Sequence, residues 1–115
     1  PGREEEENLR QLCLNVLEPL RMRFGRIIIT SGYRSNALNK AIGGTFNSQH
    51  MRGEAADIHI PNEATGRRYY LFIKHTLVFD QLLFEHRMRN GCMWLHVSFR
   101  QPPHHNRGEA MEMTI

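Results

Sequence analysis

Three segments of the chain alternate between apolar and polar residues, and this alternation constrains the fold more than any other feature. Successive side chains of a strand point to opposite faces, so the segments 54–60, 80–85 and 93–99 each predict a strand with one apolar and one polar face. Antiparallel sheets commonly have one face packed against the core and one face exposed to water, so this pattern alone does not indicate a functional site. The polar positions are Asp57, His59, Gln81, Glu85, Trp94, His96 and Ser98, and the apolar positions are Ala56, Ile58, Ile60, Leu82, Phe84, Leu95, Val97 and Phe99.

Helices are predicted around these strands. Segment 4–24 has an apolar stripe at helical spacing that includes Cys13, and an acidic start. Pro19 should kink this helix or split off its last turn, and Gly25 should end it. We therefore predict an α+β fold, a small, mainly antiparallel sheet flanked by helices. The remaining predicted elements are a short helix over 35–44, a helix over 63–78 that starts near Ala64, a buried β-branched strand over 26–32 and a weaker strand over 109–115.

Length and charge narrow the class of protein. The 115 residues are 40% hydrophobic and 23% charged, which predicts a single globular domain over 1–115. The net charge is +3, but Lys and Arg form no run, so nucleic-acid binding is not predicted; a metal-free basic domain that binds nucleic acid is the remote alternative. No apolar run reaches the ~18 residues of a membrane span. We expect a monomer, with no membrane span.

His50, Asp57 and His96 are candidate metal ligands. His50 lies seven positions before Asp57, and Gly53 between them lets the backbone bend. His96 comes from a distant predicted strand. Two histidines and a carboxylate are a usual ligand set for a catalytic zinc ion that keeps one position open. A single histidine on such a strand is more often a partly buried side chain than a metal ligand, so the prediction of a metal site depends on all three residues together.

The segments ITSGYRSNALNKAIGGTFNSQHMRGEAADI, FDQLLFE and WLHVSF resemble the zinc D-alanyl-D-alanine carboxypeptidase family. Its relatives include phage L-alanyl-D-glutamate endopeptidases, and its fold is shared with the Hedgehog signalling domain. The resemblance covers roughly 27–99 and implies one zinc ion per chain, held by His50, Asp57 and His96. It further implies that the substrate is a peptidoglycan stem peptide, and that the protein acts in the periplasm, at the extracellular cell wall, or on the wall as a phage product.

The resemblance also implies catalytic residues. Arg34, in SGYRS, would point into the site and pair with a substrate carboxylate or a developing oxyanion; a turn arginine in a surface salt bridge is the alternative. Many relatives have an acidic general base where this chain has Met93, which leaves Glu85 as the candidate base or as a structural carboxylate. The missing acid favours the alternative of a non-catalytic zinc module that binds cell-wall peptide or a protein partner. The residues predicted to bind substrate or support the ligands are Tyr33, Ser48, Gln49, His59, Gln81 and Trp94.

Overall fold

A computed structural model describes residues 2–31, 48–88 and 90–114 of the chain. The predicted helix over 35–44 lies outside these residues, as do Tyr33 and Arg34. The described elements are helices α1 (Arg3–Leu12), α2 (Glu18–Phe24) and α4 (Glu63–Thr76), a π-helical turn (Cys13–Leu17), and strands β1 (Ile29–Ser31), β2 (Ala55–His59), β3 (Gln81–His86), β4 (Met93–Ser98) and β5 (Glu109–Thr114).

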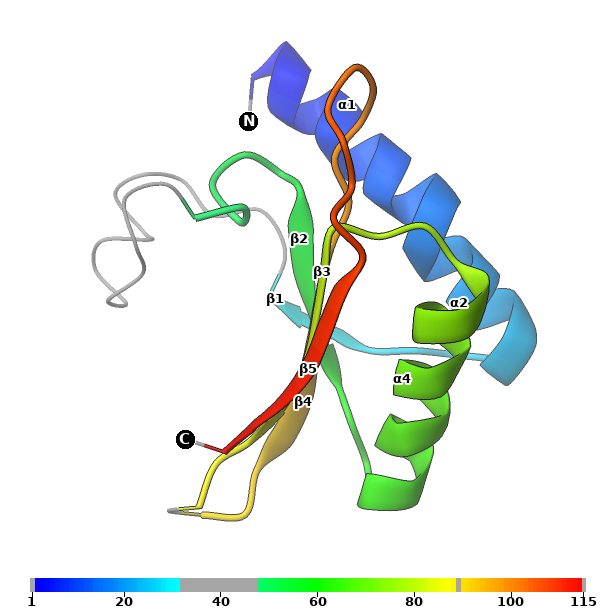
Figure 1. Ribbon diagram of the computed structural model, residues 1–115, viewed down its shortest axis with the longest axis vertical. Helices are drawn as coiled ribbons and strands as arrows, with labels where there is room; N and C mark the ends of the chain where they lie inside the picture. The colour runs from blue at the N-terminus through cyan, green and yellow to red at the C-terminus, as the bar shows by residue number, and fades with distance from the viewer. Residues whose placement is uncertain (1, 32–47, 89, 115) are drawn as a thin grey trace.

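The strands form one five-stranded sheet in the order β1-β2-β4-β3-β5. The pairs β1–β2, β2–β4 and β3–β4 are antiparallel, whereas β5 runs parallel to β3 at the edge. The helices α1, α2 and α4 lie on one side of the sheet, and the turn that precedes β2 lies on the other (Figure 1). The predicted α+β class and the mainly antiparallel sheet are confirmed.

The N-terminal helix accommodates Pro19 differently from the prediction. Instead of a break at the proline, a π-helical turn joins α1 to α2 just before it, and the Glu18 N–H donates to the Cys13 carbonyl five residues earlier. A proline has no N–H with which to continue the α-helical ladder, so a wider turn at this point costs little. Gly25 ends the helix with a φ of 86°, as predicted. Cys13 is exposed rather than part of the stripe, and the buried face consists of Asn8, Leu12, Val16 and Leu20.

The predicted strand over 26–32 is present within that range, but the prediction that it is buried is wrong. Strand β1 has three residues at the edge of the sheet, and the side chains of Ile28 and Ile29 are 47% and 41% exposed. Its pairing with β2 is also irregular between Ile29 and Ser31. A β-branched run indicates a preference for extended backbone, but it does not indicate which strand lies in the middle of the sheet.

The core lies between the sheet and the helices, and the predicted apolar strand positions are all buried in it. Helix α4 begins where predicted, with the Asn62 side chain accepting a hydrogen bond from the Thr65 N–H at 2.8 Å. A Cβ at Gly66 would lie 2.6 Å from a methyl group of Ile60, so a glycine is needed for α4 to pack this close to the sheet. The central buried residues are Ile58, Ile73, Leu82, Phe84, Leu95 and Val97.

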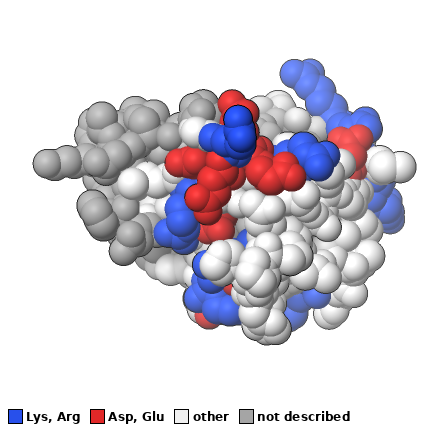
Figure 2. All heavy atoms as spheres, turned by 90° about the horizontal axis from the view of Figure 1, so that it is seen from above, with Lys and Arg blue, Asp and Glu red and all other residues white. Residues whose placement is uncertain are grey.

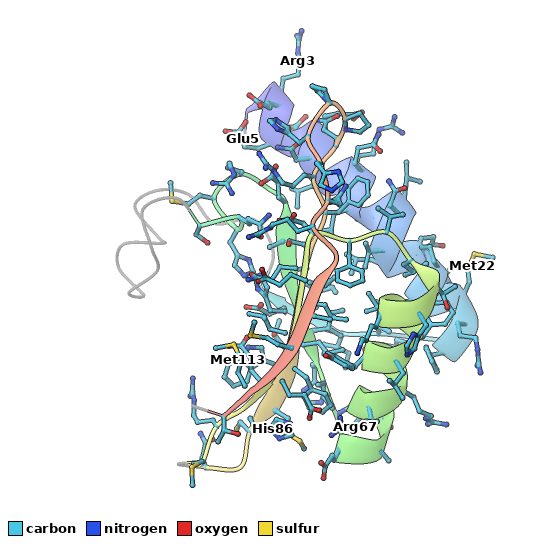
Figure 3. All side chains as sticks on the ribbon, viewed as in Figure 1. Arg3, Glu5, Met22, Arg67, His86 and Met113 are labelled. Atoms are coloured by element: carbon cyan, nitrogen blue, oxygen red, sulfur yellow. The ribbon has the colours of Figure 1, made fainter. Side chains whose placement is uncertain are left out.

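The surface mixes charges of both signs. Seen from above, acidic and basic atoms lie next to one another at the upper end of the molecule (Figure 2). Some large apolar side chains are exposed singly; Met22, at 76% exposure, points away from the body of the molecule (Figure 3). Among the described residues, no helix is both long enough and apolar enough to cross a membrane.

Candidate metal centre

His50, Asp57 and His96 come together on the sheet face opposite the helices. Asp57 and His96 are direct cross-strand partners in β2 and β4, so the pairing register places their side chains next to each other. His96 Nδ1 lies 3.1 Å from Asp57 Oδ1, and His50 Nε2 lies 3.3 Å from the same oxygen. One ligand atom from each residue lies within 4.8 Å of the others, so the three could hold a metal ion.

The turn that holds His50 is fixed by close contacts with helix α1. Gly53 has a φ of 74°, and a Cβ there would lie 2.5 Å from the carbonyl oxygen of Glu5. The buried Asn8 side chain donates to the carbonyl of Arg52 at 2.8 Å. The predicted bend at Gly53 is therefore present, and only glycine suits both its backbone angle and its contact with α1.

The electrostatics of the three residues suit a cation. Burial alone would raise the pKa of Asp57, but hydrogen bonds from His50 and His96 lower it to about 2. The carboxylate is therefore ionised at neutral pH. Two imidazole nitrogens and one carboxylate oxygen form a donor set that zinc uses in catalytic sites with one open position. The residues present thus fit a zinc ion.

A cleft of about 910 Å³ opens over this cluster. Glu85 and Trp94, which are cross-strand partners on β3 and β4, line it one row of side chains along from His96. Burial raises the pKa of Glu85, partly offset by the nearby His96 and by a hydrogen bond from the Trp94 side chain. The cleft is lined by Ser48, Gln49, His50, Arg52, Asp57, Asp80, Gln81, Leu83, Glu85, Trp94, His96, Arg100 and Arg107.

A comparison with known protein families identifies the chain. The family model described as peptidase M15 matches residues 3–98, which include the whole candidate metal cluster. The chain belongs to the peptidase M15 family. No curated protein matches it. M15 peptidases are zinc-dependent metallopeptidases, so family and geometry agree on a metal-dependent hydrolase.

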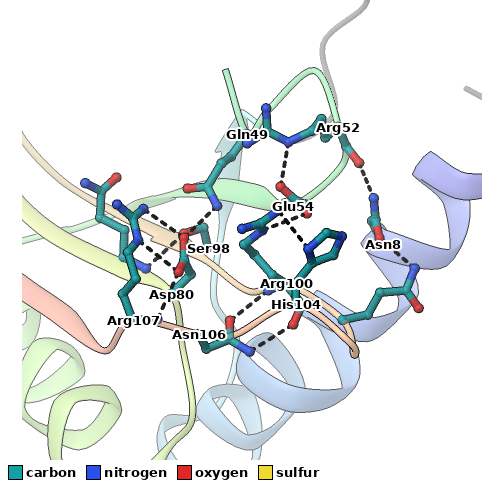
Figure 4. Close-up of polar contacts among 12 residues, drawn as sticks. Asn8, Gln49, Arg52, Glu54, Asp80, Ser98, Arg100, His104, Asn106 and Arg107 are labelled. Atoms are coloured by element: carbon teal, nitrogen blue, oxygen red, sulfur yellow. Dashed lines mark hydrogen bonds and ion pairs between the residues drawn. The ribbon is translucent and has the colours of Figure 1, made fainter. Parts of the chain in front are cut away.

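The upper end of the cleft contains a polar network that was not predicted from the sequence (Figure 4). Asp80 is 1% exposed and accepts hydrogen bonds from Gln49 Nε2 at 2.9 Å and from Arg107 Nε and Nη2 at 3.1 and 2.9 Å. Arg107 lies beyond the matched residues, as does Arg100. Asp80 stands in the FDQLLFE segment, which was the available signal; nothing in the sequence around Arg107 indicated a place in the cleft.

The other predicted site residues divide into three groups. Gln49, Gln81 and Trp94 line the cleft, together with Ser48, whose Oγ accepts from the His50 N–H at 3.2 Å. His59 has an exposed side chain that is not among the residues lining the cleft. The structure does not describe Tyr33 and Arg34, so their roles stay predictions.

Proposed function

We propose that this M15 protein is a zinc peptidase that hydrolyses peptide bonds in peptidoglycan stem peptides. The single observation behind the proposal is the His50–Asp57–His96 cluster, which opens into a cleft with Glu85 one row away. The likeness to D-alanyl-D-alanine carboxypeptidases and L-alanyl-D-glutamate endopeptidases supports the choice of substrate. Such a substrate would place the protein at the cell wall, outside the cytoplasm or released by a phage.

In this proposal three residues hold one zinc ion per chain, and a fourth handles the proton. His50, Asp57 and His96 are the ligands. When bound, the ion supplies Lewis acidity that activates water and polarises the peptide carbonyl. Glu85 accepts the proton of the attacking water on a carboxylate oxygen and delivers it to the leaving amine. The raised pKa of Glu85 suits a group that both takes up and releases a proton.

Two further residues would assist. The hydrogen bond from the Trp94 side chain orients the Glu85 carboxylate within the cleft. Arg34 would pair with a substrate carboxylate or stabilise negative charge on the carbonyl oxygen as it is attacked; this role rests on the resemblance of SGYRS to the family. Cleavage either at a terminal D-Ala-D-Ala bond or at an internal L-Ala-D-Glu bond falls within the proposal.

The alternative function is a non-catalytic zinc module that binds cell-wall peptide or a protein partner. The observation that favours it is Met93, which stands where many relatives have an acidic base. The two functions make the same prediction for metal content and opposite predictions for turnover.

Digestion of purified peptidoglycan with product mass analysis tests the proposal. Wild-type protein should release peptide fragments whose masses identify the cut bond, and a chelator should stop the release until zinc is restored. Glu85→Gln should retain zinc and lose about 10²–10⁴-fold in turnover, the usual contribution of general-base catalysis. Zinc-loaded wild type that binds stem peptide without cutting it would establish the non-catalytic module instead.

A further inference from the structure

We propose that Arg100 and Arg107 form a carboxylate-binding subsite at the end of the cleft away from Glu85. It would take a carboxylate of the peptide substrate, two or three residues from the cleaved bond. This inference rests on the proposed peptidase function and adds a substrate feature that the function does not itself require. It is carried by the position and the anchoring of the two arginines.

The register of the sheet sets the position of this subsite. Glu85 pairs with Trp94, and Leu83 pairs with His96 in the next row. Beyond that row the Asp80 N–H donates to the carbonyl of Ser98 at 2.8 Å, so Asp80 and the Arg100 that follows Ser98 lie on the far side of the metal cluster. Each row of same-face side chains advances about 7 Å along a strand. The metal cluster therefore lies between a carboxylate at one end of the cleft and arginines at the other.

Arg107 is held so that its guanidinium faces the cleft. Its Nε and Nη2 bind Asp80 in a two-point contact, and its side chain is 53% exposed while that of Asp80 is 1% exposed (Figure 4). Among the described residues, Nη1 has an ion-pair contact only, at 3.9 Å from Glu109. The buried carboxylate thus fixes the arginine from below and leaves the Nη1 donors for a ligand, which lowers the entropic cost of binding.

Arg100 shows the same asymmetry with another buried acid. Its Nε lies 3.6 Å from Glu54, whose side chain is 4% exposed against 33% for Arg100. This distance exceeds that of a hydrogen bond, and the buried Nε has no hydrogen-bond partner among the described residues. Its Nη2 lies 3.1 Å from His104 Nδ1, so Arg100 is held on two sides, although its contact with Glu54 is longer than that of Arg107 with Asp80 (Figure 4).

An ordinary surface ion pair on the same protein looks different. Arg67 and Glu112 are 2.7 Å apart, and their side chains are exposed to a similar degree, 38% and 45%. Arg67 lies on α4, on the helical side of the sheet (Figure 3). A buried acid beneath an arginine that lines the cleft is what separates Arg100 and Arg107 from Arg67; Arg52 shares this arrangement, since its Nε lies 2.8 Å from Glu54. Planar guanidinium groups of this kind suit two-point recognition of a carboxylate.

The distance from the metal cluster defines the substrate feature. The arginines lie roughly two rows of side chains from the row of His96. With the length of their side chains included, this places their guanidinium groups about 10–14 Å from the metal cluster. An extended peptide spans about 3.3–3.6 Å per residue. A peptide whose cleaved carbonyl lies at the metal would therefore present a carboxylate two or three residues away. In a stem peptide cut within the chain that group is either the terminal carboxylate or the carboxylate of an acidic residue; in one cut at its terminal D-Ala-D-Ala bond it is the acidic residue, because the terminal carboxylate is then only one residue from the cleaved bond.

Binding to four peptides tests the subsite and distinguishes the two sources. The probe is a stem pentapeptide ending in D-Ala-D-Ala, made with a terminal carboxylate or amide and with D-Glu or D-Gln. Calorimetry on zinc-loaded Glu85→Gln protein keeps the peptides intact. One of the two changes from acid to amide should weaken binding about 10–100-fold, the usual cost of losing a charge-assisted hydrogen bond.

Arginine variants in the same background complete the test. Arg107→Gln and Arg100→Gln should weaken binding of the acid peptide and leave binding of the matching amide unchanged, and the control Arg67→Gln should change neither. If Arg107→Gln does not fold around the buried Asp80, Arg107→Lys, which keeps the charge without the planar fork, should give a smaller loss on the acid peptide only.

The outcomes separate the two proposals. If the arginine variants affect acid and amide peptides equally, or affect neither, while the wild type cleaves peptidoglycan, the subsite is wrong and the peptidase function stands. If the zinc-loaded protein neither binds nor cleaves any of the four peptides and leaves peptidoglycan intact, the proposed function fails and the subsite with it.

Discussion

The two faces of the sheet are built in different ways. On the helical face, apolar side chains such as Phe84 and Leu95 are fully buried against α1, α2 and α4. On the opposite face, Asp57, Glu85 and His96 are only partly buried and line the cleft. Neighbouring residues of one strand therefore serve different purposes, since one stabilises the fold and the next forms the site.

The two faces also differ in what holds them together. The helical face depends on packing, which many residues share. The site face depends on a few polar contacts between distant segments, including Asn8 with Arg52 and Gln49 with Asp80. Single substitutions on the site face should therefore change function with little loss of stability, and those on the helical face should do the reverse.

The largest expected effect is the loss of zinc from His96→Ala. Substitution of groups that merely support a metal ligand typically costs 10–100-fold in affinity, so removal of a ligand should cost more and leave little zinc after purification. His59→Ala is the matched control, because His59 is a strand histidine outside the cluster. Elemental analysis of protein purified without added metal measures both. Full zinc in His96→Ala would contradict the ligand assignment.

The second prediction compares Phe99 with Trp94. Phe99 is buried in the core at 6% exposure, so Phe99→Ala should lower the free energy of unfolding by about 3–5 kcal/mol. Trp94 lines the cleft and is only partly buried, so Trp94→Ala should cost less stability and more activity. Urea denaturation and peptidoglycan digestion measure the two effects. The reverse order would mean that the faces of β4 are wrongly assigned.

Alternation within strands was the part of the fold that the sequence predicted well. The period of two is set by backbone geometry alone, so the faces of Ile58 and Val97 could be predicted without knowledge of the strand order. Strand order depends on contacts between distant segments, which explains why Ile28 and Ile29 were wrongly predicted to be buried. The parallel pairing of β5 with β3 likewise leaves no mark in the local pattern.

The site could be predicted where residue types were chemically specific. His50, Asp57 and His96 are typical metal ligands at informative spacing, and the structure brings them together. Asp80 and Arg107 are common residue types in ordinary surroundings, and their contact depends on how the loop before β5 returns across the sheet. Asn8 was missed because a polar residue near the start of an acidic helix normally faces water.

The third prediction concerns two glycines with similar backbone angles. Gly53 and Gly91 have φ of 74° and 69°, but only Gly53 contacts another segment, the carbonyl of Glu5. Gly91→Ala should cost about 1–2 kcal/mol, the price of left-handed backbone in an L-residue. Gly53→Ala should cost about 1–3 kcal/mol more because of the steric overlap, and should weaken zinc binding because His50 lies on the same turn.

Denaturation of both glycine variants, with zinc titrations, gives the comparison. Equal losses of stability and unchanged zinc affinity would show that the contact of the His50 turn with α1 does not position the ligand. This result would also weaken the view that the site face depends on a few contacts between distant segments.

The smallest expected effect is a pH dependence of stability in the zinc-free protein, opposite in sign for two carboxylates of the site face. The folded-state pKa of Asp57 is lowered to about 2, so its contribution to stability is present above the unfolded pKa and is lost as pH falls toward about 2.

Glu85 behaves in the opposite way. Burial raises its folded-state pKa, so its contribution to stability is present below the unfolded pKa and is lost as pH rises through the higher folded value. Glu85→Gln removes that loss. The stability of Glu85→Gln relative to wild type should therefore increase as the pH rises above about 4, whereas that of Asp57→Asn should decrease between about pH 2 and about pH 5. Urea denaturation across this range measures both, and a Glu85→Gln difference that does not change with pH would mean that Glu85 is as well solvated in the fold as in the unfolded chain.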